Sequence, residues 1–582
     1  MSILASLARA YDRLPDAPPF GFSSEKIGFL ISLNADGRMV SVSDLRTGEG
    51  KKKIAPTMLV PQPVKRTAGI APNFLWDKTS YVLGVTAGEG KRTADEHAAF
   101  IQRHETDLAN TEDAGLRALL LFLKNWTADQ FMAPDWPEEM KDQNVVFALE
   151  DERLRNVRLH DRPAAKELWG RLSAAGDRDA RICLVTGEPG PVARLHPSIK
   201  GVWGAQSSGA ALVSFNLDSF TSFGHEQGNN APVSELAAAK YTTALNRFLE
   251  RDSGHRIQIG DASTVFWADA SEANSDAAEL AESVFGGMLD TVDERMQSSK
   301  VGDVLAKIRE GRPVASFDPD LAEGVRFHVL GLAPNAARLA IRFYFEDSFG
   351  VLTENYRKFV SDMRVMPEPK EGYPPLWRYL LETAVLGKRE NIAPNLAGEW
   401  MRAILNGTNY PLTLMSSVLT RIRADGEVNA LRVGILKAVL VRNFKMEAPV
   451  AFDPDNKNKG YVLGRLFATY EQIQSAALGL KLNSSIKDKF YGSASAQPRK
   501  VFPMLESGSA NHLSKIGKQA PGWRVNLEKQ ISEIMAIMSP ADDPFPASLS
   551  SADQALFVLG YHHQRNEFFK SKKSEASGET AE

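Results

Sequence analysis

The chain has 582 residues, too many for one hydrophobic core, so roughly two to four domains are expected. Hydrophobic residues make up 43% and charged residues 24%, as in a globular protein and unlike a disordered one. The single cysteine, Cys183, excludes an intrachain disulfide and a zinc site built from several cysteines, which is typical of a reducing cytoplasm. No apolar run approaches ~20 residues, so the sequence predicts no membrane span.

The formal net charge of -3 conceals two basic segments. Residues 46–66 carry six basic side chains and one acid, and residues 457–529 carry twelve basic side chains and four acids. Two concentrations of positive charge in a near-neutral protein suggest two localised contacts with a polyanion. Solvated loops are the alternative for each lysine run.

Helices and strands are mixed in residues 1–220, which we interpret as an N-terminal α+β domain. Helical spacing of apolar residues predicts a short helix at residues 3–11 and helical structure at 94–126. "NADGR" favours a hairpin turn, because Asp-Gly tolerates the left-handed conformations that such turns need. The predicted strands are "KIGFLISL", "MVSVSDL", "SYVLGVT", "NVVFALE" and "ARICLVTGEPGPVA".

Residues 221–360 are expected to alternate between helix and strand, with β-like runs at "STVFWAD", "VRFHVLGLA" and "LAIRFYFED". The Pro334-Asn335 pair is expected at the turn between the last two of these runs. Residues 361–582 repeatedly show apolar positions three to four residues apart, which predicts an α-helical region. The fold class predicted is therefore α+β, with a mixed N-terminal region followed by a helical bundle.

Motifs for catalysis or metal binding are weak in this sequence. "TAGEGKRT" fails as a phosphate loop, because Val85 stands where the first glycine belongs and Arg92 follows Lys91. "FDPDNKNKG" lacks the turn glycine and the closing glutamate of a calcium loop. His562 and His563 would point about 100° apart on a helix, which disfavours joint metal binding. We predict no catalytic residues, metal or cofactor, although dispersed catalytic residues stay possible.

Four stretches, in this order and spacing, resemble a known family. They are "LARAYDRLPDAPPFGFSSEKIGFLISLNADG" with "VKRTAGIAPNFLWDKTSYVLG"; "CLVTGEPGPVARLHPSIKGVWGAQSSGAALVSFNLDSFTSFGHEQGNNAPVSELAAAKYTTALN"; "TVFWAD" with "FHVLGLAPNAARLAIRFY"; and "YVLGRLFATYEQIQSAALGLKLNSSIKDKFYGSASAQPRKVFPML" with "FVLGYHHQRNEFF". Together they resemble the Csd-one (Cas-eight-c) family, the large subunit of the type I-C (Dvulg-subtype) CRISPR Cascade complex. The resemblance covers nearly the whole chain, although no single block is diagnostic.

The resemblance implies a non-nuclease subunit that recognises the protospacer-adjacent motif in double-stranded DNA, promotes duplex opening and R-loop formation, and supports recruitment of a helicase-nuclease. The implied partners are a crRNA-containing Cascade with backbone, crRNA-end-binding and small subunits, the target duplex, and the helicase-nuclease, in the cytoplasm and without a membrane. It also implies a small-subunit-like helical bundle at about 446–570. The alternatives are a metal-dependent nucleic-acid-processing enzyme and a scaffold that binds no DNA.

The segment "RTAGIAPNFLWD", residues 66–77, is the predicted motif-reading loop. The amide of Asn73 can pair with a base edge, and Phe74 or Trp76 could wedge or stack at the separating base pair. The alternative is structural: Asn73 closes a turn, both aromatic side chains lie in the core, and Arg66 pairs with Asp77.

Basic residues near this loop and in the C-terminal region are the predicted phosphate contacts, because phosphate contacts position a protein on DNA. The N-terminal set is Lys51, Lys52, Lys53, Lys65 and Arg66, and the C-terminal set is Lys487, Lys489, Arg499 and Lys500, with Lys481, Lys515 and Lys518 nearby. The C-terminal set suits a helical bundle with one basic face, and a generic solvated surface is the alternative.

Overall fold

The computed structural model describes the chain except residues 1, 15–16, 49–52, 65, 67–68, 133, 175–179, 270–274, 290–299, 371, 373, 480–483, 540 and 579–582. Two compact units make up the fold: unit 1 is residues 1–197 and 213–244, and unit 2 is residues 198–212 and 245–582. The domain limits predicted at 220 and 360 do not coincide with these units. Residue 220 lies within unit 1 and residue 360 within helix α12 (Phe349–Met363), so separate folding of three domains stays a prediction.

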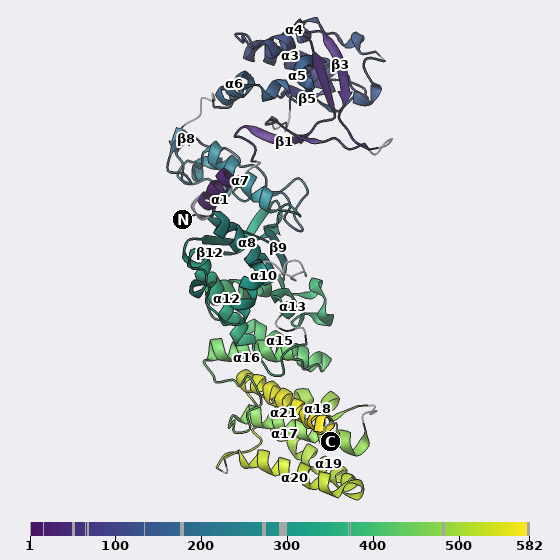
Figure 1. Ribbon diagram of the computed structural model, residues 1–582, viewed down its shortest axis with the longest axis vertical. Helices are drawn as coiled ribbons and strands as arrows, with labels where there is room; N and C mark the ends of the chain where they lie inside the picture. Colours follow the sequence, from purple (N-terminus) through teal and green to yellow (C-terminus); the bar gives the residue numbers. More distant parts are fainter. Residues whose placement is uncertain are drawn as a thin grey trace. The chain divides into compact units, whose positions relative to one another are not determined.

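Unit 1 contains a four-stranded sheet of order β3-β2-β6-β5 (Figure 1). Strand β2 pairs in parallel with β6, and the two outer pairings are antiparallel. All five residues of β2 and the last five of β6 are buried, as expected of central strands covered on both faces. The four strands are β2 (Phe29–Leu33), β3 (Met39–Asp44), β5 (Trp76–Lys78) and β6 (Asn144–Leu149).

The hairpin predicted at "NADGR" is confirmed, because it joins β2 to β3, and Gly37 adopts a positive φ of 76° there. The strand predicted at "SYVLGVT" is wrong. Strand β5 ends at Lys78, and the chain continues as a short helix, α2 (Thr79–Val82), that buries Tyr81 and Val82. A short apolar run does not distinguish a buried strand from a buried helical turn.

Several shorter elements complete unit 1. Strands β1 (Phe22–Lys26) and β4 (Thr57–Pro61) pair in a separate ribbon, as do β7 (Ala180–Ile182) and β8 (Pro189–Pro191). Asp113 caps helix α4 by accepting the backbone N–H groups of Gly115 and Leu116, which starts the helix with Leu116 in the core. The helices are α1 (Ile3–Arg13), α3 (Thr93–Asp107), α4 (Ala114–Asn125), α5 (Glu150–Arg153), α6 (Pro163–Ala174) and α7 (Glu235–Phe248).

Unit 2 begins with an antiparallel sheet of order β12-β11-β10-β9. Phe266, Phe285 and Phe327 bring the sheet and helix α8 together, with ring centroids 4.9–6.2 Å apart. The predicted strand-turn-strand is confirmed, with the turn at Ala336, just after the expected Pro334-Asn335. The elements are β9 (Arg256–Ile259), β10 (Ala262–Asp269), α8 (Ser275–Leu289), α10 (Lys300–Arg309), α11 (Pro319–Glu323), β11 (Arg326–Asn335), β12 (Arg338–Ser348) and α12.

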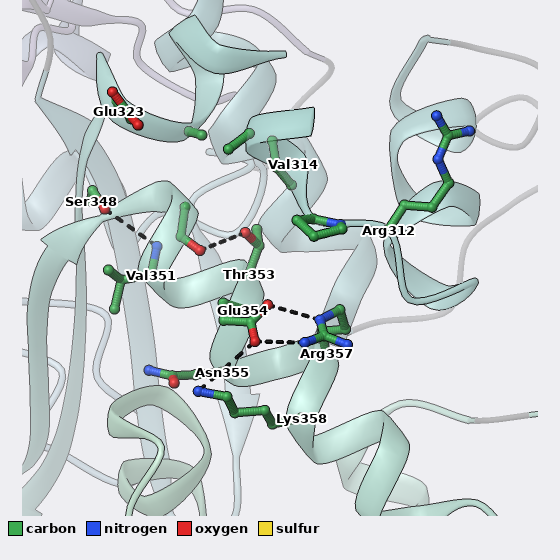
Figure 2. Close-up of a pocket in the computed structure, with 14 residues that line it drawn as sticks. Arg312, Val314, Glu323, Ser348, Val351, Thr353, Glu354, Asn355, Arg357 and Lys358 are labelled. Carbon is green, nitrogen blue, oxygen red and sulfur yellow. Dashed lines mark hydrogen bonds and ion pairs between the residues drawn. The ribbon is translucent and has the colours of Figure 1, made fainter. Parts of the chain in front are cut away.

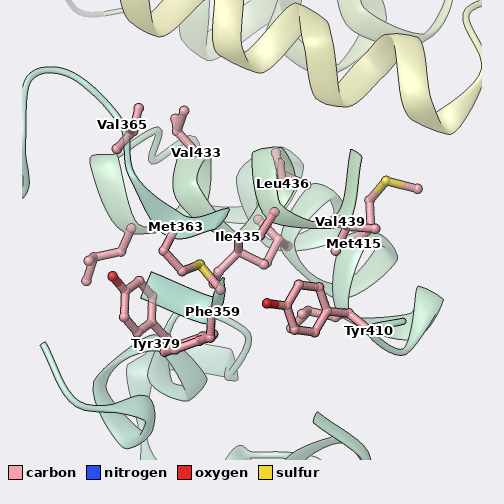
Figure 3. Close-up of a cluster of buried hydrophobic side chains, with 14 of the residues drawn as sticks. Phe359, Met363, Val365, Tyr379, Tyr410, Met415, Val433, Ile435, Leu436 and Val439 are labelled. Carbon is pink, nitrogen blue, oxygen red and sulfur yellow. The ribbon is translucent and has the colours of Figure 1, made fainter. Parts of the chain in front are cut away.

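Helices make up the rest of unit 2, which confirms the α+β fold class. One continuous core joins them to the sheet, and Figure 3 shows the part where Phe359 and Met363 of α12 meet Tyr379 and Ile435. The helices are α13 (Leu376–Leu381), α14 (Pro394–Asn406), α15 (Leu412–Asp425), α16 (Ala430–Phe444), α17 (Lys459–Leu478), α18 (Ile486–Ala496), α19 (Pro498–Gln519), α20 (Pro521–Ala536) and α21 (Ser551–Gly578).

Two buried arginines on α16 form ion pairs within unit 2. Arg432 is 5% exposed, and its guanidinium lies 3.0 Å from Glu382 and 2.7 Å from Asp425. Arg442 pairs with Asp362 at 2.6 Å. Burying such a charge is tolerated because a partner compensates it. These two arginines are therefore structural and are not available to a polyanion.

Helices α17 and α21 cross at very short range because glycines lie at their contact. A Cβ atom added at Gly464 would lie 2.1 Å from the carbonyl oxygen of Phe557, and one at Gly560 would lie 2.0 Å from that of Tyr461. Gly460 makes a third such contact, at 2.1 Å from the Asp553 carbonyl. Only glycine allows this approach, so the helices cannot pack in this way with any side chain at these positions.

We therefore expect Gly464→Ala to destabilise unit 2. The added methyl group overlaps a backbone carbonyl, and overpacking of this kind typically costs about 1–3 kcal/mol. The matched control is Gly508→Ala in α19, where nothing lies within 4 Å of the added Cβ; this change should stabilise its helix by up to about 1 kcal/mol. Thermal unfolding followed by circular dichroism measures both, and equal melting temperatures would contradict a tight crossing.

Candidate nucleic-acid interface

Asn73 closes the loop that the sequence assigns to motif reading. Its side-chain oxygen accepts the backbone N–H of Val64 at 3.0 Å, and its own backbone N–H donates to Asp77 at 2.8 Å. Only 3% of the residue is exposed. The geometry matches the turn-closing alternative, and the amide is not accessible to a base edge here. Base reading by Asn73 stays a prediction, and it requires the bond from Val64 to break.

The side chain of Arg66 also holds this loop in place. Its Nε donates to the carbonyl of Ala71 at 2.7 Å, its Nη2 pairs with Asp77, and the guanidinium lies 4.0 Å from the Tyr81 ring centroid. Burial raises the pKa of the Asp77 carboxyl, and the Arg66 guanidinium opposes this rise. The expected Arg66–Asp77 pair is therefore present. A phosphate contact by Arg66 would leave a buried carboxyl without this partner.

Phe74 and Trp76 lie in the core of unit 1. Phe74 is fully buried and stacks on Trp169 at a centroid distance of 5.3 Å. Trp76 is 3% exposed, and its indole N–H donates to the carbonyl of Pro61 at 2.7 Å. The core alternative is confirmed for both side chains. In this structure neither can stack on a base or wedge between base pairs, because both side chains are packed in the core.

His104 is the residue behind this loop that sequence reasoning missed. Leu75 adopts a positive φ of 64°, and its N–H donates to His104 Nε2 at 2.9 Å. His104 Nδ1 lies 2.8 Å from the Phe100 carbonyl, so it carries the ring proton and the imidazole is neutral. Burial lowers the pKa of His104 to about 3. A histidine four residues after Phe100 on a helix gives no sequence signal for this contact.

The loop should consequently be sensitive to acid. Unfolded His104 takes up a proton near its ordinary pKa of about 6.5, but the folded protein resists this until about pH 3. Falling pH between these values therefore favours unfolding, by up to about 1.4 kcal/mol per pH unit. In His104→Gln, melting temperatures measured from pH 7 to pH 5 should fall less than in the wild type. If the melting temperatures of the variant and the wild type fall in parallel, His104 is not the group responsible for the sensitivity to acid.

Replacing Asn73 separates its two possible roles. Asn73→Ala removes the acceptor of the Val64 N–H, and losing a typical hydrogen bond costs about 0.5–1.5 kcal/mol. We expect a lower melting temperature and weaker binding to cognate and scrambled motifs together. A base reader would instead lose about 1–3 kcal/mol on the cognate motif alone, with stability retained. The measurement is melting temperature and motif-dependent affinity on one variant at one salt concentration.

The N-terminal basic segment is partly neutralised. Lys53 Nζ lies 2.8 Å from Asp44 and 3.1 Å from Glu139, and Arg46 pairs with the same two carboxylates. These cations hold the pKa of Asp44 well below its usual range, mainly through the Arg46 hydrogen bond. Lys51, Lys52 and Lys65 lie outside the described residues. A phosphate would have to compete with the two carboxylates for Lys53, which makes Lys53 a weaker candidate than the sequence indicated.

The predicted C-terminal contacts divide into engaged and available side chains. Lys487 is half-buried over the Tyr561 ring, at 5.6 Å from its centroid, and burial lowers the pKa of its ammonium group. Arg499 pairs with Asp543 at 2.5 Å. Lys489 and Lys500 are exposed, and neither forms an ion pair with any carboxylate of the described residues. The last two side chains are therefore the stronger candidates for phosphate contacts.

Helix α19 carries the clearest basic face. Lys500, Lys515 and Lys518 are exposed, and none forms an ion pair within the described part of the chain. Lys515 and Lys518 lie three residues apart on one side of the helix, and 18 residues separate Lys500 from Lys518, a whole number of turns. The three ammonium groups thus span about 27 Å of one helix face. We call Lys500, Lys515 and Lys518 the α19 lysine face.

A separate cavity of about 410 Å³ lies beside the N-terminus of α12 (Figure 2). Its lining includes Glu354, but Arg357 binds that carboxylate through two hydrogen bonds of 2.7 and 2.8 Å, and Lys358 lies 3.9 Å away. A carboxylate held in this way is a poor general base, because both of its oxygens accept from a cation. The Ser348 hydroxyl is also engaged, as the cap that accepts the Val351 N–H.

Within the residues that the structure describes, no three histidine, cysteine, aspartate or glutamate side chains gather closely enough to hold a metal ion. Across the same residues, no helix combines the length and the apolar character needed to cross a bilayer.

Comparison with known proteins first defines a class: the chain is similar over most of its length to CRISPR-associated proteins. The matching family model is described as CRISPR-associated protein (Cas_Csd1), and it covers residues 7–569. The chain therefore belongs to the Csd1 family, and the resemblance found in the sequence is confirmed. No curated protein matches the chain.

Proposed function

We propose that this chain is the large subunit of a type I-C RNA-guided surveillance complex in the cytoplasm. In this role it recognises the protospacer-adjacent motif in duplex DNA, promotes R-loop formation and supports recruitment of a helicase-nuclease. The single observation that carries the proposal is the family match across residues 7–569. The α19 lysine face supports the DNA-binding part, because exposed lysines without carboxylate partners are suited to phosphate contacts.

The proposal divides the work between base pairing and protein. Guide–target pairing reads the long sequence, so the protein needs only a short motif and contacts to the backbone. The α19 lysine face would hold a strand by its phosphates, which carry no sequence information. Lys489, which is exposed and unpaired with any described carboxylate, would extend these contacts. Motif reading is assigned to unit 1, where hydrogen bonds with Val64 and Asp77 hold Asn73.

Catalysis is left to the partner nuclease in this proposal. The observation that supports this is that Arg357 occupies Glu354, one of the two carboxylates that line the α12 cavity. DNA cleavage that co-purifies with the chain and disappears with a chelator would favour the metal-dependent enzyme instead. A chain that binds its complex but no DNA would favour the scaffold.

The α19 lysine face provides the test of DNA binding. Replacing Lys500, Lys515 and Lys518 by alanine should weaken binding of the assembled complex to any duplex. The slope of log affinity against log salt should fall by up to about one unit per lost contact. Fluorescence anisotropy with labelled duplexes at several salt concentrations measures both quantities.

A matched control removes the same number of charges from neighbouring positions. Arg499, Arg524 and Lys529 lie on α19 and α20, and each pairs with a carboxylate, Asp543, Glu528 and Glu533 respectively. Their triple alanine variant has the same net charge as the lysine-face variant. Its salt slope should stay closer to that of the wild type. Equal losses in both variants would mean that net charge alone is responsible and that the α19 lysine face is not the site.

A further inference from the structure

Phe223 is the most exposed large hydrophobic residue that the structure describes, at 99%. It stands in a two-residue turn between Ser222 and His225, which form an antiparallel bridge. The N–H of His225 donates to the Ser222 carbonyl at 2.9 Å, and Phe223 and Gly224 both have positive φ, 50° and 77°. We call residues 222–225 the Phe223 turn.

In the free chain, the conformation and exposure of Phe223 are energetically unfavourable. Turns with two positive φ values favour asparagine or glycine at the first central position, and a bulky side chain there is an outlier. The ring also exposes its full apolar surface to water, which is unfavourable. No described ring stacks on Phe223. A strained and exposed aromatic residue is the kind of feature that binding to another molecule can compensate.

Hydrogen bonds hold the base of the turn, so the backbone of Phe223 is presented in a defined place. Ser222 N–H donates to the Asn230 side chain at 3.1 Å, and Asn230 Nδ2 donates to the Gln227 carbonyl at 3.0 Å. Gly228 packs so closely that an added Cβ would lie 2.0 Å from the Ala193 carbonyl oxygen. Little backbone freedom is left for this segment to lose on binding, which favours an anchoring role.

The charge around the turn indicates the kind of partner. Between Lys200 and Lys240 the sequence has no lysine or arginine, and three acids, Asp218, Glu226 and Glu235, give this stretch a net charge of -3. Arg194 reaches the segment, where its Nε donates to the Gln227 side chain. Phosphates would be repelled by such a segment, because polyanion binding relies on concentrated positive charge. Leu217, 52% exposed, adds apolar surface instead.

We propose that the Phe223 turn is a protein-docking anchor whose ring inserts into an apolar pocket with a basic rim on another subunit. Aromatic side chains that fill a pocket dominate the binding energy of many interfaces. The acidic residues Asp218 and Glu226, which lie near Phe223 in the sequence, would complement a basic rim. The inference rests on the proposed function, which places the chain in a complex of several proteins.

The test uses the full chain and, as the probe, the guide-RNA-loaded complex assembled without it. Asparagine suits the conformation of residue 223, so Phe223→Asn should keep or raise the melting temperature. Binding to the immobilised complex should nevertheless weaken by at least about tenfold. The matched control is Leu386→Asn, because Leu386 is 78% exposed, has a φ of 58° and also precedes a glycine. Its binding should equal that of the wild type.

A charge reversal distinguishes a protein pocket from nucleic acid. Glu226→Lys should weaken binding if the partner surface is basic, and should tighten it if the partner is the guide RNA. Tighter binding, or wild-type affinity in Phe223→Asn, would overturn the proposed anchor while leaving the proposed function standing. A wild-type chain that binds neither the complex nor duplex DNA would overturn the proposed function and the anchor together.

Discussion

The close crossing of α17 and α21 is the constraint on which the C-terminal part of unit 2 depends. Three glycines let the backbones approach until added Cβ atoms would overlap carbonyl oxygens. The apolar side chains on either side of this contact then pack in one core that continues to α16 and α12. Helices α18, α19 and α20 are placed by their contacts with this pair and with one another. The position of the α19 lysine face consequently depends on a backbone contact between two other helices.

Pairing of charges, more than their number, separates structural from available basic residues in this chain. Arg66, Arg432 and Arg442 are held by carboxylates in buried or half-buried positions. Lys500 and Lys515 are exposed on α19 without such partners among the described residues. Both groups contribute equally to a charge count along the sequence. Only the second group can exchange water and counterions for phosphate without leaving a carboxylate behind.

Local signals in the sequence predicted much of the fold. The Asp-Gly hairpin, most strands and the helical C-terminal region follow from patterns within about ten residues, and the structure confirms them. The short helix at Tyr81 was mistaken for a strand, because four apolar residues fit either structure. The pairing of β1 with β4 was not predicted, because their residues lie more than thirty positions apart in the sequence.

The candidate site was harder to predict than the fold. Asn73, Phe74 and Trp76 carry the same chemistry whether they face DNA or the core, and only long-range packing decides between the two. One of the two partners of Lys53 is Glu139, 86 positions away, and no local pattern links them. His104 was invisible for the same reason, since its contact with Leu75 joins residues 29 positions apart.

The cluster of Arg46 and Lys53 with Asp44 and Glu139 also affects how ionic strength acts on this protein. Its ion pairs are partly exposed, so added salt screens them just as it screens contacts between lysine and phosphate. Concentrated salt would free these two cations from their own carboxylates while it weakens their attraction to DNA. An ionic-strength titration of the whole protein therefore combines the loss of these internal ion pairs with counterion release. For Lys53, loss of the internal pairs favours contact with DNA, whereas screening disfavours it.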